Sequence, residues 1–262
     1  MLFRSCLQLH LDRNAVKMEL ETLGFPQNIY DFTVETINQP NGIFAVTGPT
    51  GCGKTTTLYS ALRRINTIDA KLLTVEDPVE YDVEGIMQVQ TNEAAGLTFM
   101  KALRAFLRQD PDIIMIGEIR DHETAQIAVQ ASLTGHLVLA TLHTNDAVSA
   151  VTRLTDMGIE PFLLSSSLLG VLAQRLVRKT CTACQGSGCA ACGHTGYQGR
   201  TGIFELLGVD EPLRELIHNR ASESDLLRQA QRNGLGSLRE DGERLVALGL
   251  TSREELLRVT RD

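Results

Sequence analysis

The stretch GPTGCGKTTT, Gly48–Thr57, decides the fold class of this 262-residue chain. Four of its residues satisfy the pattern G-x-x-x-x-G-K-[ST]: Gly48, Gly53, Lys54 and Thr55. The apolar run IFAVT (43–47) precedes it and the helix-like segment KTTTLYSALRRI (54–65) follows it. Because the pattern lies between a buried strand and a helix, it predicts a phosphate-binding loop. A glycine-rich turn without a ligand is the alternative, and this context disfavours it.

We expect this loop to bind ATP together with Mg²⁺. Lys54 is placed to reach the β- and γ-phosphates, and the Thr55 hydroxyl to ligate Mg²⁺, at the start of a helix whose dipole favours anions. Cys52 could make binding sensitive to oxidation, although a small residue that simply fits is the favoured interpretation. The nucleotide-binding residues predicted from this loop are Gly48, Pro49, Thr50, Gly51, Cys52, Gly53, Lys54, Thr55 and Thr56.

Four short apolar runs recur along the chain, separated by segments of helical pattern. The runs are IFAVT (43–47), KLLTV (71–75), DIIMI (112–116) and HLVLATL (136–142). Runs of this length and composition are typical of strands buried on both faces of a parallel sheet. Segments between them, such as LTFMKALRAFLRQ (97–109), have the pattern of amphipathic helices. The sequence therefore predicts an α/β fold with a mainly parallel sheet.

Composition argues against several classes of protein. The formal net charge is −7, so no overall positive field attracts nucleic acid or anionic lipid. No apolar run approaches the roughly 18 residues that a membrane span needs. We interpret the start, MLFRSCLQLHL, as neither an anchor nor a signal peptide. We therefore expect a cytoplasmic protein with no nucleic-acid partner and no direct membrane insertion.

Two acids and a histidine follow the predicted strands, at the edge where parallel sheets bind ligands. Glu80 comes shortly after the second run, Glu118 follows the third and His143 follows the fourth. Taken singly, each is more often a helix cap, a solvated acid or a structural histidine. Together with Lys54 they favour a catalytic site for hydrolysis of a nucleoside triphosphate, where positioning and charge stabilisation dominate. Glu118 suits water polarisation, Glu80 could share that task, and His143 suits contact with the γ-phosphate.

Three further polar residues are less decisive. His136 stands at the far end of the fourth run, away from the predicted catalytic edge, so we expect a structural role for it. Arg104 and Arg108 lie four residues apart on a predicted helix, where like charges repel by about 0.2–0.5 kcal/mol. The nearby Asp110 and Asp112, or a phosphate bound by a neighbouring subunit, would offset that repulsion. A solvated helix face is an equal alternative.

Four cysteines with the spacing C-x2-C-x4-C-x2-C predict a metal site: Cys181, Cys184, Cys189 and Cys192. Two such pairs suit tetrahedral Zn²⁺ bound by four thiolates, and the glycines between the pairs allow the tight geometry. Disulfides or reduced thiols are the alternatives, and His194 is a substitute ligand to consider. Because four cysteines fill the coordination sphere, we expect structural rather than catalytic zinc.

The composition of the chain changes along its length and predicts four segments. They are a lead-in segment (1–40), an α/β nucleotide-binding core (41–178), a metal-binding knuckle (179–200) and a helical C-terminal subdomain (201–262). The pattern is interpreted as helical from Ile203 onward. Ser222 is expected to start one of these helices, and Thr251 another, with Glu254 completing a capping box.

Together these motifs resemble the ATPases of type II secretion and pilus assembly, over nearly all of residues 14–262. The matching motifs, in the family's order, are GPTGCGKTTTLY (Walker A), TVEDPVEY (74–81, Asp box), LRQDPDIIMIGEIRD (107–121, Walker B) and TGHLVLATLHTN (134–145, His box). Four ordered motifs make the resemblance specific. The segments 154–178 and 196–207 are more similar to the type II branch and the pilus-extension motors than to the retraction motors.

The resemblance implies a RecA-like P-loop NTPase core and a homo-hexamer in which ATP turnover moves domains. It implies catalytic acids at Glu80 and Glu118, γ-phosphate contact at His143, and intersubunit phosphate contacts at Arg104 and Arg108. It further implies that the motion is passed to inner-membrane platform proteins to assemble a pseudopilus or pilus. The protein would then associate peripherally with the inner membrane through these partners.

This chain departs from the family pattern in two places. Family members carry N-terminal domains that this sequence lacks, so residues 1–40 are expected to be a remnant of that region. They also separate the two cysteine pairs by a longer loop. A type II secretion motor is the favoured function and a pilus-extension motor is close to it. A DNA-processing RecA-like motor is disfavoured by the acidic balance, and a nucleotide-binding regulator without turnover is the remaining alternative.

Overall fold

The computed structural model describes residues 19–260, so residues 1–18 of the predicted lead-in segment (1–40) lie outside them. The strands are β1 (Gly42–Thr47), β2 (Leu72–Glu76), β3 (Met87–Gln90), β4 (Ile113–Ile116), β5 (Leu137–Leu142), β6 (Leu168–Thr180) and β7 (Tyr197–Gly208). The α-helices are α1 (Gln27–Ile37), α2 (Lys54–Ile65), α3 (Phe99–Phe106), α4 (His122–Leu133), α5 (Ala147–Asp156), α6 (Pro161–Ser167), α7 (Glu211–His218), α8 (Glu223–Arg232), α9 (Leu238–Ala247) and α10 (Arg253–Val259). Short 3₁₀ helices are η1 (Leu20–Thr22), η2 (Glu93–Ala95) and η3 (Ala190–Cys192).

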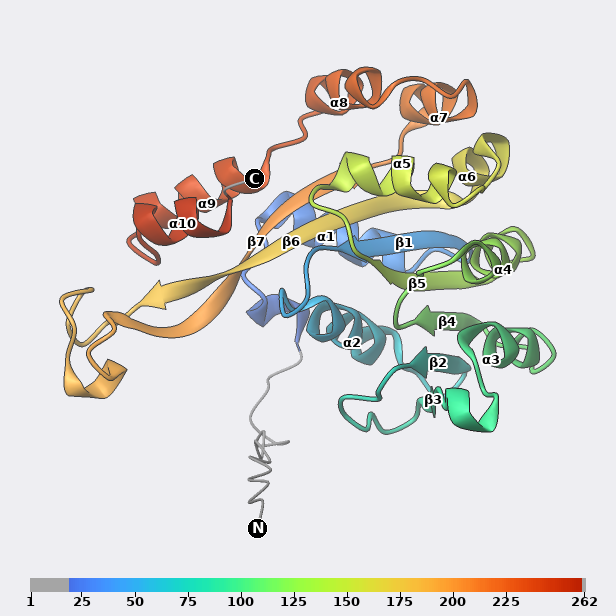
Figure 1. Ribbon diagram of the computed structural model, residues 1–262, viewed down its shortest axis with the longest axis horizontal. Helices are drawn as coiled ribbons and strands as arrows, with labels where there is room; N and C mark the ends of the chain where they lie inside the picture. The colour runs from blue at the N-terminus through green and yellow to red at the C-terminus, as the bar shows by residue number, and fades with distance from the viewer. Residues whose placement is uncertain (1–18, 261–262) are drawn as a thin grey trace, which may run out of the picture.

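The strands form one sheet in the order β3-β2-β4-β5-β1-β6-β7 (Figure 1). Neighbouring strands are parallel except for the antiparallel pair β6–β7. The four apolar runs of the sequence correspond to β1, β2, β4 and β5, and each of these strands is buried at every position. The predicted α/β fold with buried parallel strands is therefore confirmed. Because these strands are parallel, their carboxyl ends meet at one edge of the sheet.

Helices cover both faces of the sheet and give it two apolar cores. In β1, Ile43 and Ala45 enter the core that α3 to α8 cover, whereas Phe44 and Val46 enter the core that α1 and α2 cover. Because alternate side chains of β1 pack beneath α2, this helix lies against β1. The loop that follows β1 then leads directly into the N-terminus of α2. None of the helices within residues 19–260 combines the length and the apolar character that crossing a bilayer requires.

Strands β6 and β7 form a long hairpin that extends beyond the sheet and ends in the cysteine knuckle (Figure 1). The prediction of a helical pattern from Ile203 onward is wrong for residues 203–208, which lie in β7. The run IFELL has the composition of a helix as well as of a buried strand. Pairing with β6, a contact between distant segments, decides the outcome. The predicted segment boundaries after residues 178 and 200 therefore fall inside these two strands.

The C-terminal helices begin partly where the sequence predicts. Ser222 caps α8 by accepting a hydrogen bond from the backbone N–H of Asp225, which confirms that start. The predicted cap at Thr251 is wrong, because Ser252 caps α10 instead. The Thr251 hydroxyl donates to the carbonyl oxygen of Arg178 (2.8 Å). Because the Thr251 side chain makes this contact with β6, it does not cap the helix as the local pattern predicted.

Candidate functional site

One pocket of about 450 Å³ lies at the carboxyl ends of the central strands and collects most of the predicted site residues. The four predicted catalytic residues all line it: Lys54, Glu80, Glu118 and His143. The loop residues that line it are Thr50, Gly51, Cys52, Gly53, Lys54, Thr55 and Thr56. The predicted loop residues Gly48 and Pro49 do not line the pocket. They contact Lys54 through their carbonyl oxygens.

The loop runs from the end of β1 to Lys54, the first residue of α2. The side chain of Lys54 is buried, and its Nζ donates to the carbonyl oxygens of Gly48 (2.7 Å) and Pro49 (3.1 Å). Burial lowers the pKa of Lys54, and the neighbouring Cys52 and Glu118 only partly oppose this shift. The ammonium group of Lys54 lies at the N-terminus of α2, where the helix dipole also favours a bound anion.

Glu118 follows β4 and is held by two partners. Its Oε2 lies 2.6 Å from Nη2 of Arg120, and its Oε1 lies 3.1 Å from Nε2 of His143. Burial raises the pKa of this carboxyl, but the hydrogen bond from Arg120 and the nearby charges of His143, Arg120 and Lys54 outweigh it, so the net pKa is lowered. Glu118 is therefore a carboxylate at neutral pH, oriented by a fixed partner on each oxygen.

His143 follows β5 and is tied to the end of β1. The hydroxyls of Thr144 and Thr47 lie 2.8 Å apart, and the Thr144 N–H donates to Thr47 Oγ1 (2.9 Å). Burial and the positive charge of Lys54 lower the pKa of His143, and Glu118 only partly offsets them. The imidazole is therefore neutral at pH 7, and it retains one N–H to donate and one nitrogen to accept.

Glu80 enters the pocket from the segment between β2 and β3, and its side chain is exposed. The side chain of Gln88 on β3 fixes the backbone next to it. Gln88 Nε2 donates to the Tyr81 carbonyl oxygen (3.0 Å), and Gln88 Oε1 accepts from the Val83 N–H (2.6 Å). Gln90 Oε1 also accepts from the Val79 N–H (3.3 Å), so two amide side chains of β3 attach the segment that carries Glu80 to the sheet.

The sequence analysis missed two arginines that line the same pocket, Arg120 and Arg200. A signal for Arg120 was available, because a basic residue two positions after the predicted catalytic acid Glu118 is placed to pair with it. Arg200 lies on β7. The sequence offered no signal for it, because Arg200 was assigned to the end of the knuckle (179–200) and the strand that carries it was not predicted.

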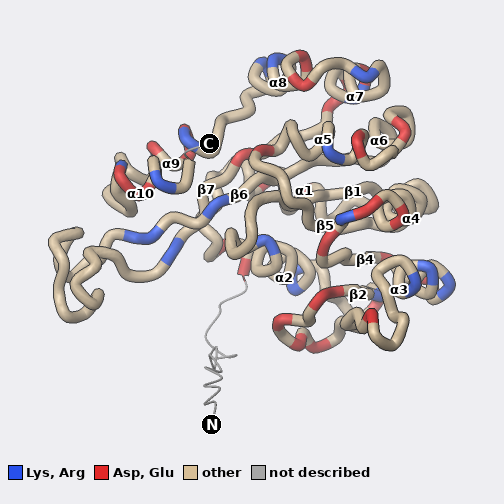
Figure 2. Tube along the Cα trace, in the orientation of Figure 1, with Lys and Arg blue, Asp and Glu red and all other residues tan. Residues whose placement is uncertain are grey.

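Arg104 and Arg108 do not line this pocket. Both are exposed on or just after α3, and Figure 2 shows the basic residues of that helix at the end of the molecule away from the phosphate loop. Within residues 19–260 neither arginine forms an ion pair with Asp110 or Asp112. Two of the predicted explanations for these arginines remain. Their side chains are solvated, or they contact a phosphate bound by a neighbouring subunit.

The structural role predicted for His136 is confirmed. Its Nδ1 lies 2.9 Å from the carbonyl oxygen of Ala131, which ties the start of β5 to the end of α4. This position is at the opposite end of β5 from His143.

The four cysteines of the knuckle have the geometry of a metal site. Their sulfur atoms all lie within 4.8 Å of one another. The Sγ–Sγ distances are 4.0 Å for Cys181 and Cys189, 3.8 Å for Cys184 and Cys192, and 3.8 Å for Cys189 and Cys192. Tetrahedral zinc with Zn–S bonds of about 2.3 Å separates its thiolates by about 3.8 Å, so these residues fit zinc.

The backbone of the knuckle also favours thiolate at one of these cysteines. The N–H groups of Cys189 and Gly196 each donate to Cys192 Sγ at 3.3 Å. These hydrogen bonds, from Cys189 first, lower the pKa of the Cys192 thiol to about 6. All four cysteines are free thiols, which contradicts the disulfide alternative, and His194 is not part of the cluster.

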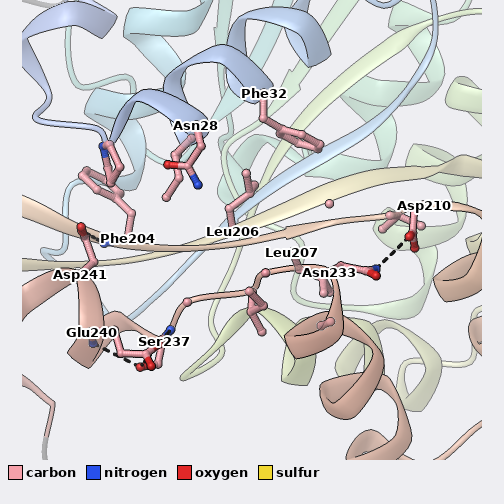
Figure 3. Close-up of a pocket in the computed structure, with 18 of the residues that line it drawn as sticks. Asn28, Phe32, Phe204, Leu206, Leu207, Asp210, Asn233, Ser237, Glu240 and Asp241 are labelled. Atoms are coloured by element: carbon pink, nitrogen blue, oxygen red, sulfur yellow. Dashed lines mark hydrogen bonds between the residues drawn. The ribbon is translucent and has the colours of Figure 1, made fainter.

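A second cavity, of about 560 Å³, lies between α1, β7 and the segment that joins α8 to α9 (Figure 3). Figure 3 shows Phe32 and Phe204 on its apolar side and a hydrogen bond between Asn233 and Asp210 at its polar end. Its described lining includes none of the predicted site residues. The four predicted catalytic residues therefore meet in the first pocket and not in this one.

The family model for type II/IV secretion system proteins matches residues 5–258. The chain belongs to this family. The resemblance inferred from its four motifs is thus confirmed.

Curated members of the family match almost the whole chain. The type II secretion system protein HxcR of Pseudomonas aeruginosa is 62% identical over 260 residues, which cover 96% of this chain and 55% of HxcR. The type II secretion system ATPase E of Vibrio cholerae is 52% identical over 277 residues, with the same two shares. The chain therefore spans about half the length of these relatives.

The fold of the family is also found among solved structures. The crystal structure of the pilus retraction motor PilT with bound ADP matches with a TM-score of 0.76 and 32% sequence identity, over 93% of this chain and 67% of that one. The P-loop NTPase core expected from the resemblance is therefore supported by fold as well as by sequence.

Proposed function

We propose that this chain is the ATPase region of a type II secretion motor, which hydrolyses ATP to ADP and phosphate. The observation that supports this most is the meeting of Lys54, Glu80, Glu118 and His143 in one pocket. A phosphate loop alone binds a nucleotide. An ionised glutamate held by two partners beside the phosphate loop supplies the group that orients an attacking water.

Each residue has a role that follows from its position. Lys54 and the N–H groups of the loop bind the β- and γ-phosphates, and Thr55 in the first turn of α2 would hold Mg²⁺, which neutralises phosphate charge. Glu118 orients and polarises the attacking water, and Glu80 assists from the segment between β2 and β3. His143 contacts the γ-phosphate, and its one N–H is shared between that phosphate and Glu118, which links loss of the phosphate to the position of the carboxylate.

Assembly and coupling are inferred from the family. We propose that the chain works as part of a homo-hexamer in which Arg104 and Arg108 contact the phosphates of a neighbouring subunit. Their exposure outside their own pocket is consistent with that use. Turnover would drive pseudopilus assembly through platform proteins at the cytoplasmic face of the inner membrane. The names of HxcR and ATPase E support the type II branch.

We further propose that Cys181, Cys184, Cys189 and Cys192 bind one structural zinc ion. The measured sulfur separations support this assignment. With four protein ligands the ion has no open position, so its contribution would be to fold the knuckle rather than to take part in hydrolysis. We keep the four predicted segments as the working division of the chain, with β6 and β7 joining the core to the knuckle.

The test is release of phosphate from ATP with Mg²⁺, measured together with particle mass. The wild-type chain and a version extended at its N-terminus would be compared with Glu118→Gln. We expect that substitution to reduce hydrolysis by about 10²–10⁴-fold, the usual contribution of a positioned acid–base group. ADP affinity should remain unchanged.

Glu215→Gln is the matched control, because Glu215 is an exposed glutamate on α7 outside the pocket. It should hydrolyse ATP at the wild-type rate. If neither wild-type form releases phosphate in any assembled state, while both bind ADP, the protein is a nucleotide-binding regulator and the motor assignment is wrong.

A further inference from the structure

The side chain of Gln174 joins β6 to the phosphate loop. Strand β6 is parallel to β1, with Thr47 opposite Ala173, so Gln174 lies just beyond the end of β1 and beside the loop. Its side chain is buried, with 2% of the residue exposed. Its Nε2 donates to the carbonyl oxygen of Cys52 (2.7 Å), and its Oε1 accepts from Oγ1 of Thr57 (2.8 Å). One amide therefore binds the end of the loop and the first turn of α2 together.

Two glycines of the loop leave room for this residue. A Cβ atom at Gly48 would lie 2.5 Å from the backbone carbonyl oxygen of Gln174, and one at Gly53 would lie 3.1 Å from its Nε2. Both glycines also have positive φ, +147° and +89°, which side chains rarely adopt. The conformation of the loop therefore allows close contact with β6 as well as binding of phosphate.

The next residue of β6 extends the contact to the histidine segment. Arg175 Nη1 donates to the carbonyl oxygen of Gln174 (3.2 Å), and its Nη2 donates to that of Asn145 (2.8 Å), two residues after His143. Adjacent residues of one strand therefore contact both loops that form the phosphate end of the pocket.

We propose that Gln174 is a positioning residue for the phosphate loop. By binding Cys52 and Thr57 on either side of Gly53 and Lys54, it holds those two residues in the conformation that receives the phosphates. The inference rests on the proposed binding of nucleotide at this pocket. Without the amide, a buried carbonyl and a buried hydroxyl lose their partners. The loop then samples other conformations, and affinity falls with the fraction that remains competent.

This role predicts a split between binding and chemistry. Glu118 and His143 are placed by β4 and β5 rather than by Gln174. In Gln174→Leu, the Kd for ADP with Mg²⁺ and the KM for ATP should rise about tenfold, as expected for loss of one buried hydrogen-bonded group. The value of kcat at saturating ATP should fall by less than about threefold, since the catalytic groups remain in place.

Thr57 provides a conservative test of the same contact. Thr57→Val removes the hydroxyl that fixes the amide, and should weaken ADP binding about threefold to tenfold. Thr57→Ser keeps the hydroxyl and should bind like the wild type. Thr33→Val is the matched control, because Thr33 is equally buried on a helix, α1, and its hydroxyl has no hydrogen-bond partner within residues 19–260. It should leave Kd, KM and kcat unchanged.

The outcomes separate this inference from the proposed function. A wild-type chain that binds ADP and hydrolyses ATP, together with a Gln174→Leu variant of unchanged Kd and KM but lower melting temperature, would show a merely structural role. If Gln174→Leu does not fold, the Thr57 pair decides: equal ADP affinities for the Val and Ser variants overturn the inference. A wild-type chain that binds no ADP at all overturns the proposed function, and this inference with it.

Discussion

Nε2 of His143 lies 3.1 Å from Oε1 of Glu118, although the two residues follow different strands of the sheet. The contact is set by the register of β4 and β5, in which Ile116 lies opposite Ala140. Both side chains then leave the same edge of the sheet at neighbouring positions. The group proposed to contact the γ-phosphate and the group proposed to orient water are thus joined by one hydrogen bond. A movement of one side chain therefore directly affects the position of the other.

The pH dependence of hydrolysis should report on this pair and on Arg120. The pKa of Glu118 is lowered and that of His143 is lowered, so both groups keep their active forms, carboxylate and neutral imidazole, at pH 7. We expect kcat/KM to be level near pH 7–8 and to fall on the acidic side of about pH 6.5, the ordinary pKa of histidine. The measurement is a pH–rate profile between pH 5 and 8.

Arg120→Gln removes the hydrogen bond that lowers the pKa of Glu118. That pKa should rise, and so should the pKa of His143, which the positive charge of Arg120 also lowers. The acidic limb of the profile, which follows His143, should therefore move to higher pH, in addition to any loss of rate. Arg220→Gln is the control, because it removes an exposed ion pair with Glu160 outside the pocket. A profile for Arg120→Gln that has a lower rate at every pH but an unmoved acidic limb would show that the arginine does not tune the pKa values of the Glu118–His143 pair.

The intersubunit role proposed for Arg104 and Arg108 predicts complementation. The double variant with both arginines changed to Ala and the variant Glu118→Gln should each lose most hydrolysis, by about 10²-fold or more, as expected for charges that stabilise phosphoryl transfer. When the two are mixed before assembly, some interfaces combine an intact glutamate with intact arginines, so activity should return. The measurement is phosphate release from mixtures of varied ratio.

Lys101→Ala is the control for this experiment, because Lys101 is an exposed cation on the same helix. It should retain wild-type hydrolysis. If the double arginine variant is fully active, the two side chains are simply solvated, as one interpretation of the sequence allowed.

Local signals explain which parts of the molecule could be predicted from sequence. The phosphate loop has a fixed spacing, and Glu118 and His143 stand directly after apolar runs that are buried strands. Parallel strands bring such ends together whatever the rest of the chain does. That is why residues far apart in the sequence could be predicted to meet in one pocket.

Contacts between distant segments explain the parts that were missed. The run Ile203–Leu207 is compatible with helix or strand, and its pairing with β6 decides the outcome. Arg200 enters the pocket only because β7 exists. Thr251 and Ser252 are adjacent and equally suited to cap a helix, and the choice between them depends on Arg178, whose carbonyl oxygen binds the Thr251 hydroxyl.

The knuckle should depend on its metal. Among the described residues it contributes no side chain to the three apolar cores, so metal binding is expected to supply most of its folding energy. We expect about one zinc ion per chain by elemental analysis, on the stoichiometry of a four-cysteine site. Loss of zinc in Cys184→Ser should be accompanied by rapid proteolysis within residues 181–196. Cys52→Ser, outside the knuckle, should keep its zinc. A metal-free chain that resists proteolysis there would contradict this assignment.

The hairpin should depend on Glu255, which anchors α10 to β6. Its buried carboxylate accepts from Arg178 (backbone N 2.9 Å, Nε 3.0 Å, Nη2 2.7 Å) and from Arg258 (Nε 2.8 Å, Nη2 2.7 Å). Burial raises its pKa, but the hydrogen bonds from Arg258 and Arg178 lower it to about 2. Because both guanidinium groups are partly exposed, we expect Glu255→Gln to reduce the free energy of unfolding by about 1–3 kcal/mol, less than for a fully buried pair.

The sign of the pH dependence follows from the lowered pKa. The unfolded chain binds a proton at Glu255 near its ordinary value of 4.5, and the folded chain only near 2. The contribution of Glu255 is therefore complete above about pH 4.5 and is lost as the pH falls toward 2. Urea unfolding at pH 7 and pH 3 should show the difference between wild type and Glu255→Gln shrink at the lower pH. Glu243→Gln, which removes an exposed contact of 3.9 Å with Arg253, should change stability by less than about 0.5 kcal/mol at pH 7. Equal destabilisation by the two substitutions would mean that the ion pairs of the buried Glu255 contribute no more to stability than the exposed contact of Glu243.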